Sequence, residues 1–186
     1  MPSIYLSPSV QDENAYVNGG TEEYYMNLIV DAMIPYLKAS GIYFERNNPN
    51  DSLTQLIAQS NLKTHNLHLA IHSDSAPRNL SGLLQGPDIY YYAHNPDSER
   101  AATIIAKNLS SIYPNSNLIT VIPSVLFDEL QRTKAPAVLA KIGYHDNFDD
   151  ALWIKEHVPI IAKNLARSLA ELFGTRFSEA FSYSMQ

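Results

Sequence analysis

The chain has 186 residues, about the length of one domain, and 45% of them are hydrophobic, so it can bury a sizeable core. Its formal net charge of −6 makes it a poor candidate for binding the phosphate backbone of nucleic acids. The sequence contains no Cys, which excludes disulfides, thiolate nucleophiles and iron–sulfur clusters. No stretch approaches the roughly 18 consecutive apolar residues of a membrane span, and residues 1–4 show no features of a secretory signal. We therefore expect a folded domain without a membrane span or a nucleic-acid partner, of unknown localisation.

Strand and helix patterns alternate along the chain. The longest predicted helix runs from Glu22 to about Ala39, with Thr21 as its N-cap and a kink or tightening at Pro35. Apolar runs predict strands at 4–6, 42–44, 67–72, 88–92, 118–122 and 136–142, and helical spacing predicts helices at 52–60, 98–113 and 149–172, the last split before Pro159. This alternation predicts a three-layer α/β domain over residues 1–174, with a twisted, mostly parallel sheet of about six strands, and a tail at 175–186.

Polar residues follow the predicted strands at 7–9, 72–74 and 141–147, and the functional site of such folds lies at the carboxyl ends of the strands. A long loop, 74–87, follows the second of these ends, and long loops are often functional. His72 is the first candidate, either as a hydrogen-bonded histidine at a strand end or as a ligand. His68 lies about 13 Å from His72 along the strand, too far to share one metal, so we expect it to be structural.

Two charged positions are unusual for the elements that carry them. Glu22 and Glu23 stand in the first turn of the long helix, where acids complement the helix dipole, and only one of the two can face the sheet. Lys141 ends an otherwise apolar strand, so its ammonium must reach solvent, pair with a carboxylate or lose its charge. No G-x-S-x-G, G-x-G-x-x-G or Walker A motif occurs, which argues against a nucleophile-elbow hydrolase and against nucleotide binding.

Five segments, in this order, carry a family resemblance: Ile4-Tyr5-Leu6-Ser7-Pro8; Gly20-Thr21-Glu22-Glu23 with Asn27-Leu28; Leu69-Ala70-Ile71-His72-Ser73; Thr133 with Pro136-Ala137-Val138-Leu139; and Gly143-Tyr144-His145-Asp146-Asn147. Together they resemble the zinc-dependent N-acetylmuramoyl-L-alanine amidases of the amidase-3 type, over residues 4–173. The resemblance implies a phosphorylase/hydrolase-like amidase fold. It also implies cleavage of the amide between N-acetylmuramic acid and the L-alanine of the peptidoglycan stem peptide. In that family His, Glu and His hold zinc, and a second Glu acts as general base.

The site residues implied by the resemblance match only in part. Glu23 fits the metal-binding Glu and His72 the second metal-binding His, and Asn147 falls in a segment implied to bind substrate. The first His is missing, because its position holds Val10 or, with a different loop alignment, Glu13. Lys141 stands at the general-base position, where an ammonium cannot accept a proton from water and repels zinc. These departures lead us to expect Lys141 to pair with Glu23, or with both Glu23 and Glu13, in place of the metal.

Three hypotheses remain open at this point. The first is an active zinc amidase, and the second is a weakly active or inactive amidase-fold protein that binds the stem peptide, the glycan or a protein partner. The third is a hydrolase with a rearranged site, in which Glu13, Glu23 and His72 hold the metal and His145 or Asp146 is the base. The cofactor is zinc if the protein is active, and none otherwise. The sequence does not separate roles in growth, sporulation or phage release.

Overall fold

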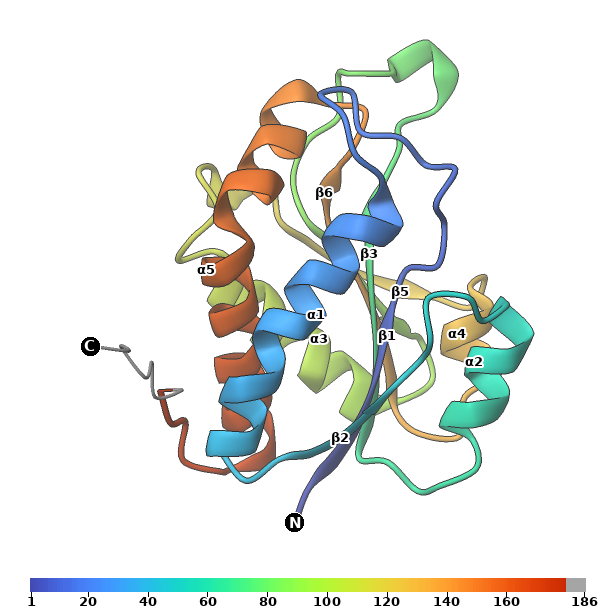
Figure 1. The fold of residues 1–186 in the computed structure, drawn as a ribbon, viewed down its shortest axis with the longest axis vertical. Helices are drawn as coiled ribbons and strands as arrows, with labels where there is room; N and C mark the ends of the chain where they lie inside the picture. The colour runs from blue at the N-terminus through green and yellow to red at the C-terminus, as the bar shows by residue number, and fades with distance from the viewer. Residues whose placement is uncertain (180–186) are drawn as a thin grey trace.

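A computed structural model describes residues 1–179, within which six strands form one sheet in the order β2-β1-β3-β6-β4-β5 (Figure 1). The strands β1, β2, β3 and β6 run parallel, whereas β4 pairs antiparallel with β6 and parallel with β5. The strands are β1 (Ser3–Pro8), β2 (Tyr43–Arg46), β3 (Leu67–Asp74), β4 (Asp88–Tyr92), β5 (Thr120–Ser124) and β6 (Ala137–Tyr144). The predicted six-stranded, mostly parallel sheet is confirmed.

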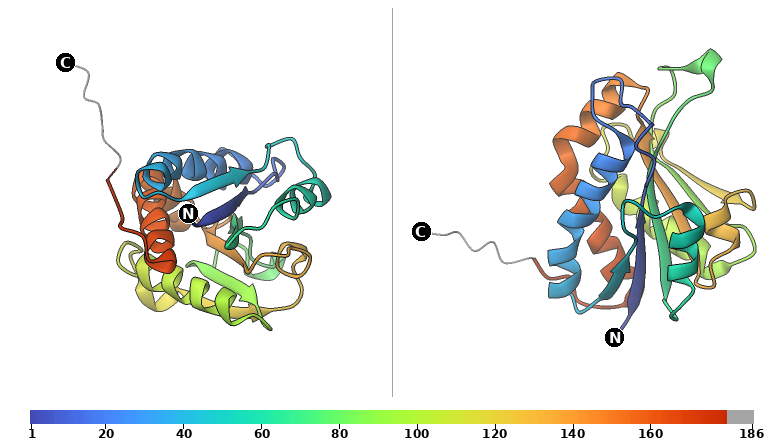
Figure 2. Two further views of the ribbon diagram at one scale, coloured as in Figure 1. Left: turned by 90° about the horizontal axis from the view of Figure 1, so that it is seen from below. Right: turned by 45° about the vertical axis from the view of Figure 1, so that its right-hand side comes forward.

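Helices cover both faces of the sheet and make three layers (Figure 2). The helices α1 (Glu22–Ala39), α3 (Pro96–Leu109) and α5 (Phe148–Phe173) pack on one face, and the shorter α2 (Leu53–Ser60) and α4 (Asp128–Gln131) lie on the other. Because side chains alternate along a strand, every second residue of β1, β3 and β6 enters the main core under α1, α3 and α5. The intervening residues face α2 and α4, as the contacts of Tyr5 with Gln59 and of His68 and His72 with Glu129 show.

Local signals set most element ends. The Thr21 hydroxyl accepts a hydrogen bond from the backbone of Tyr24 at 3.3 Å, which confirms the predicted N-cap of α1. Within α5, His157 has a non-helical backbone (φ −119°, ψ 16°) two residues before Pro159, so the predicted break before that proline is present. β5 begins two residues later than predicted, because Ser116–Leu118 form a 3-10 turn. The four residues of α4 are too few to show a helical period, and the sequence did not predict this helix.

The predicted tail begins as an ordered segment. The ring of Phe177 stacks on Tyr36 of α1 with centroids 5.8 Å apart, and the backbone nitrogen of Ser178 donates to the Ser40 hydroxyl at 3.0 Å. The remainder of the predicted tail, 180–186, lies outside the described residues. In the part of the chain that the structure describes, no helix is long and apolar enough to cross a membrane.

Candidate functional site

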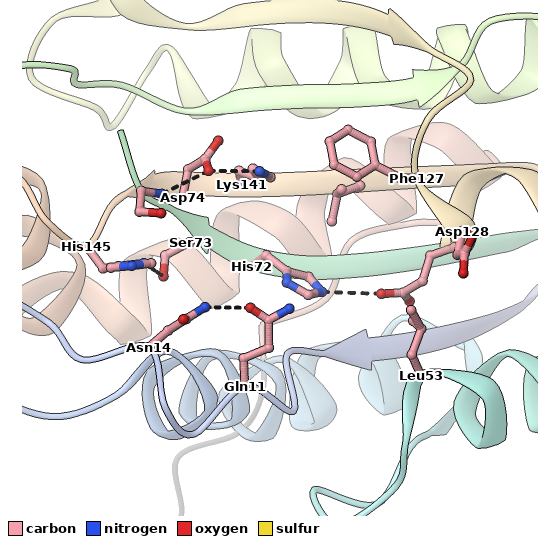
Figure 3. A pocket seen from close by; sticks show the side chains of 13 residues that line it. Gln11, Asn14, Leu53, His72, Ser73, Asp74, Phe127, Asp128, Lys141 and His145 are labelled. Carbon is pink, nitrogen blue, oxygen red and sulfur yellow. Dashed lines mark hydrogen bonds and ion pairs between the residues drawn. The ribbon is translucent and has the colours of Figure 1, made fainter. Parts of the chain in front are cut away.

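A cavity of about 310 Å³ lies at the carboxyl ends of β3 and β6 (Figure 3). Its walls include His72, Ser73 and Asp74 from β3 and Lys141 from β6. Other walls come from three further segments, with Gln11 and Asn14 following β1, His145 following β6, and Phe127, Asp128 and Glu129 from the α4 region. The segment after β1 therefore folds over the site, a point that the sequence had left undecided.

His72 lies between two carboxylates. Its Nδ1 is 2.9 Å from Oε1 of Glu22, and its Nε2 is 3.3 Å from Oε1 of Glu129. Burial alone would lower the pKa of His72, but the hydrogen bonds and charges of Glu129 and Glu22 outweigh it and raise the pKa to about 9. At neutral pH the ring is therefore an imidazolium that donates through both nitrogens.

Glu129, which the sequence interpretation missed, joins this histidine to a buried network. Its Oε2 accepts hydrogen bonds from the Ser7 hydroxyl at 2.6 Å and from Nε2 of His68 at 2.8 Å. The other ring nitrogen of His68 lies 2.9 Å from the Ser60 hydroxyl, which gives His68 the structural place expected of it. Burial alone would raise the pKa of Glu129, but the hydrogen bonds from His68 and His72 lower it. Glu129 is thus a buried carboxylate held by three donors.

The structure places Glu22, rather than Glu23, beside His72. Glu22 is 1% exposed, and its carboxylate also accepts from the Asn14 amide at 2.7 Å and from the backbone nitrogen of Ser73 at 3.3 Å. Burial alone would raise the pKa of Glu22, but the bonds from His72 and Asn14 lower it. Glu23 is only partly buried and lines a separate surface hollow beside Val10 and Asp12.

A signal for Glu22 was present in the sequence. Residues at 26, 29 and 33 of α1 are buried, and position 22 continues that stripe by one helical turn toward the N-terminus. The neighbouring position 23 lies about 100° away around the helix axis. Extending the apolar stripe of α1 into its first turn would have identified Glu22, and not Glu23, as the buried acid.

Lys141 pairs with Asp74, and the expected pair with Glu23 is wrong. Its Nζ lies 2.8 Å from Oδ1 of Asp74, and 5.5 and 5.2 Å from the ring centroids of Tyr90 and Phe127. The register between β3 and β6 shifts after the His72–Lys141 pair, so that Asp74 lies opposite Tyr144. No sequence pattern predicted this irregularity. It brings the Asp74 carboxylate, at the end of β3, to the Lys141 ammonium, so Lys141 has a partner without Glu23 of α1.

Two other candidates hold loops in place. The Asn147 side chain caps α5, accepting from the backbone nitrogens of Asp149 and Asp150 at 3.0 and 3.2 Å, and donates to the carbonyl of Gly82 at 2.8 Å. The Asp146 carboxylate accepts from the 76–82 segment, at Ala76 N, Ser81 Oγ and Gly82 N. Both side chains therefore anchor the long loop between β3 and β4.

The remaining candidates differ in their access to the cavity. Glu13 is exposed and does not line it. His145 does line it, and its Nδ1 lies 3.0 Å from the Ser73 hydroxyl. Burial lowers the pKa of His145 below its ordinary value, which favours the neutral ring. The structure thus brings together His72, Lys141 and His145 but leaves Glu13 and Glu23 outside the cavity.

The sequence model of the N-acetylmuramoyl-L-alanine amidase family (Amidase_3) matches residues 9–171. The chain belongs to this amidase family. No curated protein matches the sequence. Among solved structures, the amidase AmiC2 of Nostoc punctiforme superposes with a TM-score of 0.80 at 16% identity, covering 93% of this chain and 97% of its own. An amidase from Clostridium difficile 630 gives a TM-score of 0.81 at 14% identity, with 93% and 97% covered. These likenesses confirm the amidase fold.

A third neighbour was solved with a second protein. The CwlD amidase from Clostridioides difficile, in complex with the GerS lipoprotein, gives a TM-score of 0.79 at 14% identity and covers 94% of this chain and 99% of its own. The fold of this chain is therefore shared by amidases from several bacteria.

The donor set around His72 does not fit the zinc site of the family. In residues 1–179, no group of three or more His, Cys, Asp or Glu side chains is arranged to hold a metal ion. His72 directs both ring nitrogens to carboxylates, with Nδ1 2.9 Å from Glu22 and Nε2 3.3 Å from Glu129, so neither nitrogen faces an open ligand position. Lys141 adds a second cation in the same cavity. We therefore assign no step to a metal.

Proposed function

We propose that this amidase-family protein is weakly active or inactive as a hydrolase and binds the peptidoglycan stem peptide in its cavity. The observation that carries the proposal is the Lys141 ammonium, held by Asp74 at 2.8 Å where the family resemblance implies a general-base Glu. An ammonium cannot take a proton from an attacking water, so this position no longer supplies the base of amide hydrolysis.

The neighbouring groups support the same reading. His72 and its two carboxylates form a hydrogen-bonded set that satisfies the buried charges without a metal. The cavity still presents amide, hydroxyl and charged groups, from Gln11, Ser75 and Lys141 among others, which suit the polar backbone of a peptide. Binding without cleavage is the function that such a lining supports best.

A protein partner belongs to the proposal as well. CwlD, a neighbour that shares the fold, was solved in complex with the GerS lipoprotein. That precedent supports a role in which this chain contacts peptidoglycan through its cavity and another protein through its outer surface.

A binding and cleavage assay on purified peptidoglycan tests the proposal. The protein is incubated with sacculi in zinc-supplemented buffer, the bound fraction is measured by co-sedimentation, and cleavage is measured as newly exposed L-alanine amino groups. We expect the wild type to sediment with the sacculi and to release at least a hundredfold fewer amino groups than an active amidase of the family. Lys107→Met, on the exposed surface of α3, serves as a charge-matched control for Lys141→Met.

Three results would count against the proposal. Turnover close to that of the active amidase would favour the alternative, a zinc-dependent amidase with a rearranged site. Absence of the wild type from the sedimented fraction would remove peptidoglycan as the ligand. Equal binding by Lys141→Met and Lys107→Met would place the peptidoglycan contact outside the cavity.

A further inference from the structure

We propose that the cavity recognises an amino-acid zwitterion, an ammonium and a carboxylate on one carbon, through the ion pair of Asp74 and Lys141. The inference rests on the proposed function, because it names the part of the stem peptide that the cavity takes. A diamino acid that is joined to a peptide through one end keeps such a zwitterion at its other end. The free end of a stem-peptide diamino acid is therefore the occupant.

Most charged groups of the cavity already have fixed partners. His72 is shared by Glu22 and Glu129, and Asp128 pairs with Arg132 at 3.1 Å. The pair of Lys141 with Asp74 remains, with 16% and 18% of the two side chains exposed, and both residues line the cavity. This pair therefore offers one positive and one negative contact to a ligand.

The pair has spare bonding capacity on the carboxylate side. Oδ1 of Asp74 receives both the Lys141 ammonium and the backbone nitrogen of Ser75, each at 2.8 Å. Oδ2 of Asp74 has no hydrogen-bond partner within residues 1–179. A ligand ammonium can bind this oxygen before the existing ion pair opens.

The sheet is locally distorted at this pair. The pairing of β3 with β6 passes from His72–Lys141 to Asp74–Tyr144, so β6 carries one extra residue between them. Bulges of this kind re-aim side chains and are common beside functional sites. The irregularity places Asp74, at the end of β3, beside Lys141 of β6 at the cavity wall.

Charge balance selects a zwitterion over a simple ion. A ligand with only a carboxylate would draw Lys141 away and leave Asp74 partly buried without its partner, and a ligand with only an ammonium would do the reverse. A zwitterion replaces both partners at once. The rings of Tyr90 and Phe127 flank the Lys141 ammonium and hold it in place while its partner changes.

The size of the cavity agrees with this occupant. About 310 Å³ is at the lower end of the range for small-molecule sites, which suits one amino-acid group and leaves little room for a disaccharide. The peptide part of peptidoglycan, rather than its glycan, therefore enters the cavity.

Three probes of matched chain length test the inference by calorimetric titration at pH 7. Diaminopimelate carries zwitterionic ends, pimelate lacks the ammonium groups, and 1,5-diaminopentane lacks the carboxylates. We expect wild-type protein to bind diaminopimelate at least tenfold more tightly than either of the other two. We also expect Lys141→Met and Asp74→Asn each to weaken that binding at least tenfold, with Lys107→Met unchanged. Thermal melting of each variant checks that it is folded, and the comparison of probes on the wild type does not depend on any variant.

The other outcomes are equally definite. Equal affinity for pimelate and diaminopimelate, or no binding of diaminopimelate, would overturn the inference. Diaminopimelate that binds in the cavity without displacing the protein from sacculi would overturn the stem peptide as the source of the zwitterion. If sacculi bind the wild type and both charge variants alike, this inference fails and the peptidoglycan contact lies outside the cavity, while peptidoglycan binding itself stands. If neither the wild type nor the variants bind sacculi, the proposed function fails, whatever the titration with diaminopimelate shows.

Discussion

Replacement of Glu129 by Gln is expected to lower the free energy of unfolding by about 3 kcal/mol, the scale seen when one member of a buried ion pair is removed. The substitution keeps the shape of the side chain but removes the charge that His72 and His68 share. A carboxylate has two acceptor oxygens, whereas the Gln amide has one acceptor oxygen and an NH2 group that only donates. At least one of the three donors around Glu129 therefore loses its acceptor. Urea unfolding at pH 6, followed by circular dichroism, measures the change.

The adjacent Asp128 provides a matched control. Asp128 lies on the same short helix, but its side chain is 47% exposed and pairs with Arg132 across one turn. Asp128→Asn is therefore expected to cost less than 1 kcal/mol. A loss for Glu129→Gln no larger than the loss for Asp128→Asn would show that the buried network contributes little to stability.

Stability is expected to fall between pH 6.5 and about 9, as His72 loses its proton in the folded protein. The pKa of His72 is raised in the folded state, so its contribution is complete below pH 6.5 and disappears as pH rises through about 9. A shift of this size corresponds to roughly 3 kcal/mol. Thermal or urea unfolding at half-unit steps of pH measures the decline.

The other titrating groups of the network act outside this window. The pKa values of Glu22 and Glu129 are lowered, so the stability they provide is present above pH 4.5 and is lost as pH falls below it. The pKa of His145 is lowered too, so its titration changes stability only below pH 6.5. His72→Gln should therefore remove the decline between pH 6.5 and 9, and a decline of unchanged size in that variant would contradict the assignment.

The fold could be predicted from the sequence because its signals are local and repeated. Apolar runs, the Thr21 cap and the break before Pro159 each act within a few residues, and together they define a β/α alternation. The direction of β4 was not accessible in this way, because strand direction depends on the path of the connections rather than on the strand itself.

The site could be predicted only in outline. His72 and Lys141 were found because polar residues at the ends of apolar strands are conspicuous. Glu129 was missed because it lies 57 residues from His72 in a four-residue helix without a period, and only tertiary packing brings the two together. The partner of Lys141 was missed for a related reason, since the register shift that brings Asp74 to it leaves no pattern in the sequence.

The central claim is that the carboxylates and cations of this site satisfy one another and leave no place for zinc. Elemental analysis tests it most directly. Protein purified without chelator is given equimolar zinc, dialysed and measured beside an active amidase of the family treated in the same way. We expect less than about a tenth of a zinc per chain for this protein, because its donor set lacks a third ligand and holds an ammonium. About one zinc per chain, retained as firmly as in the active amidase, would contradict it.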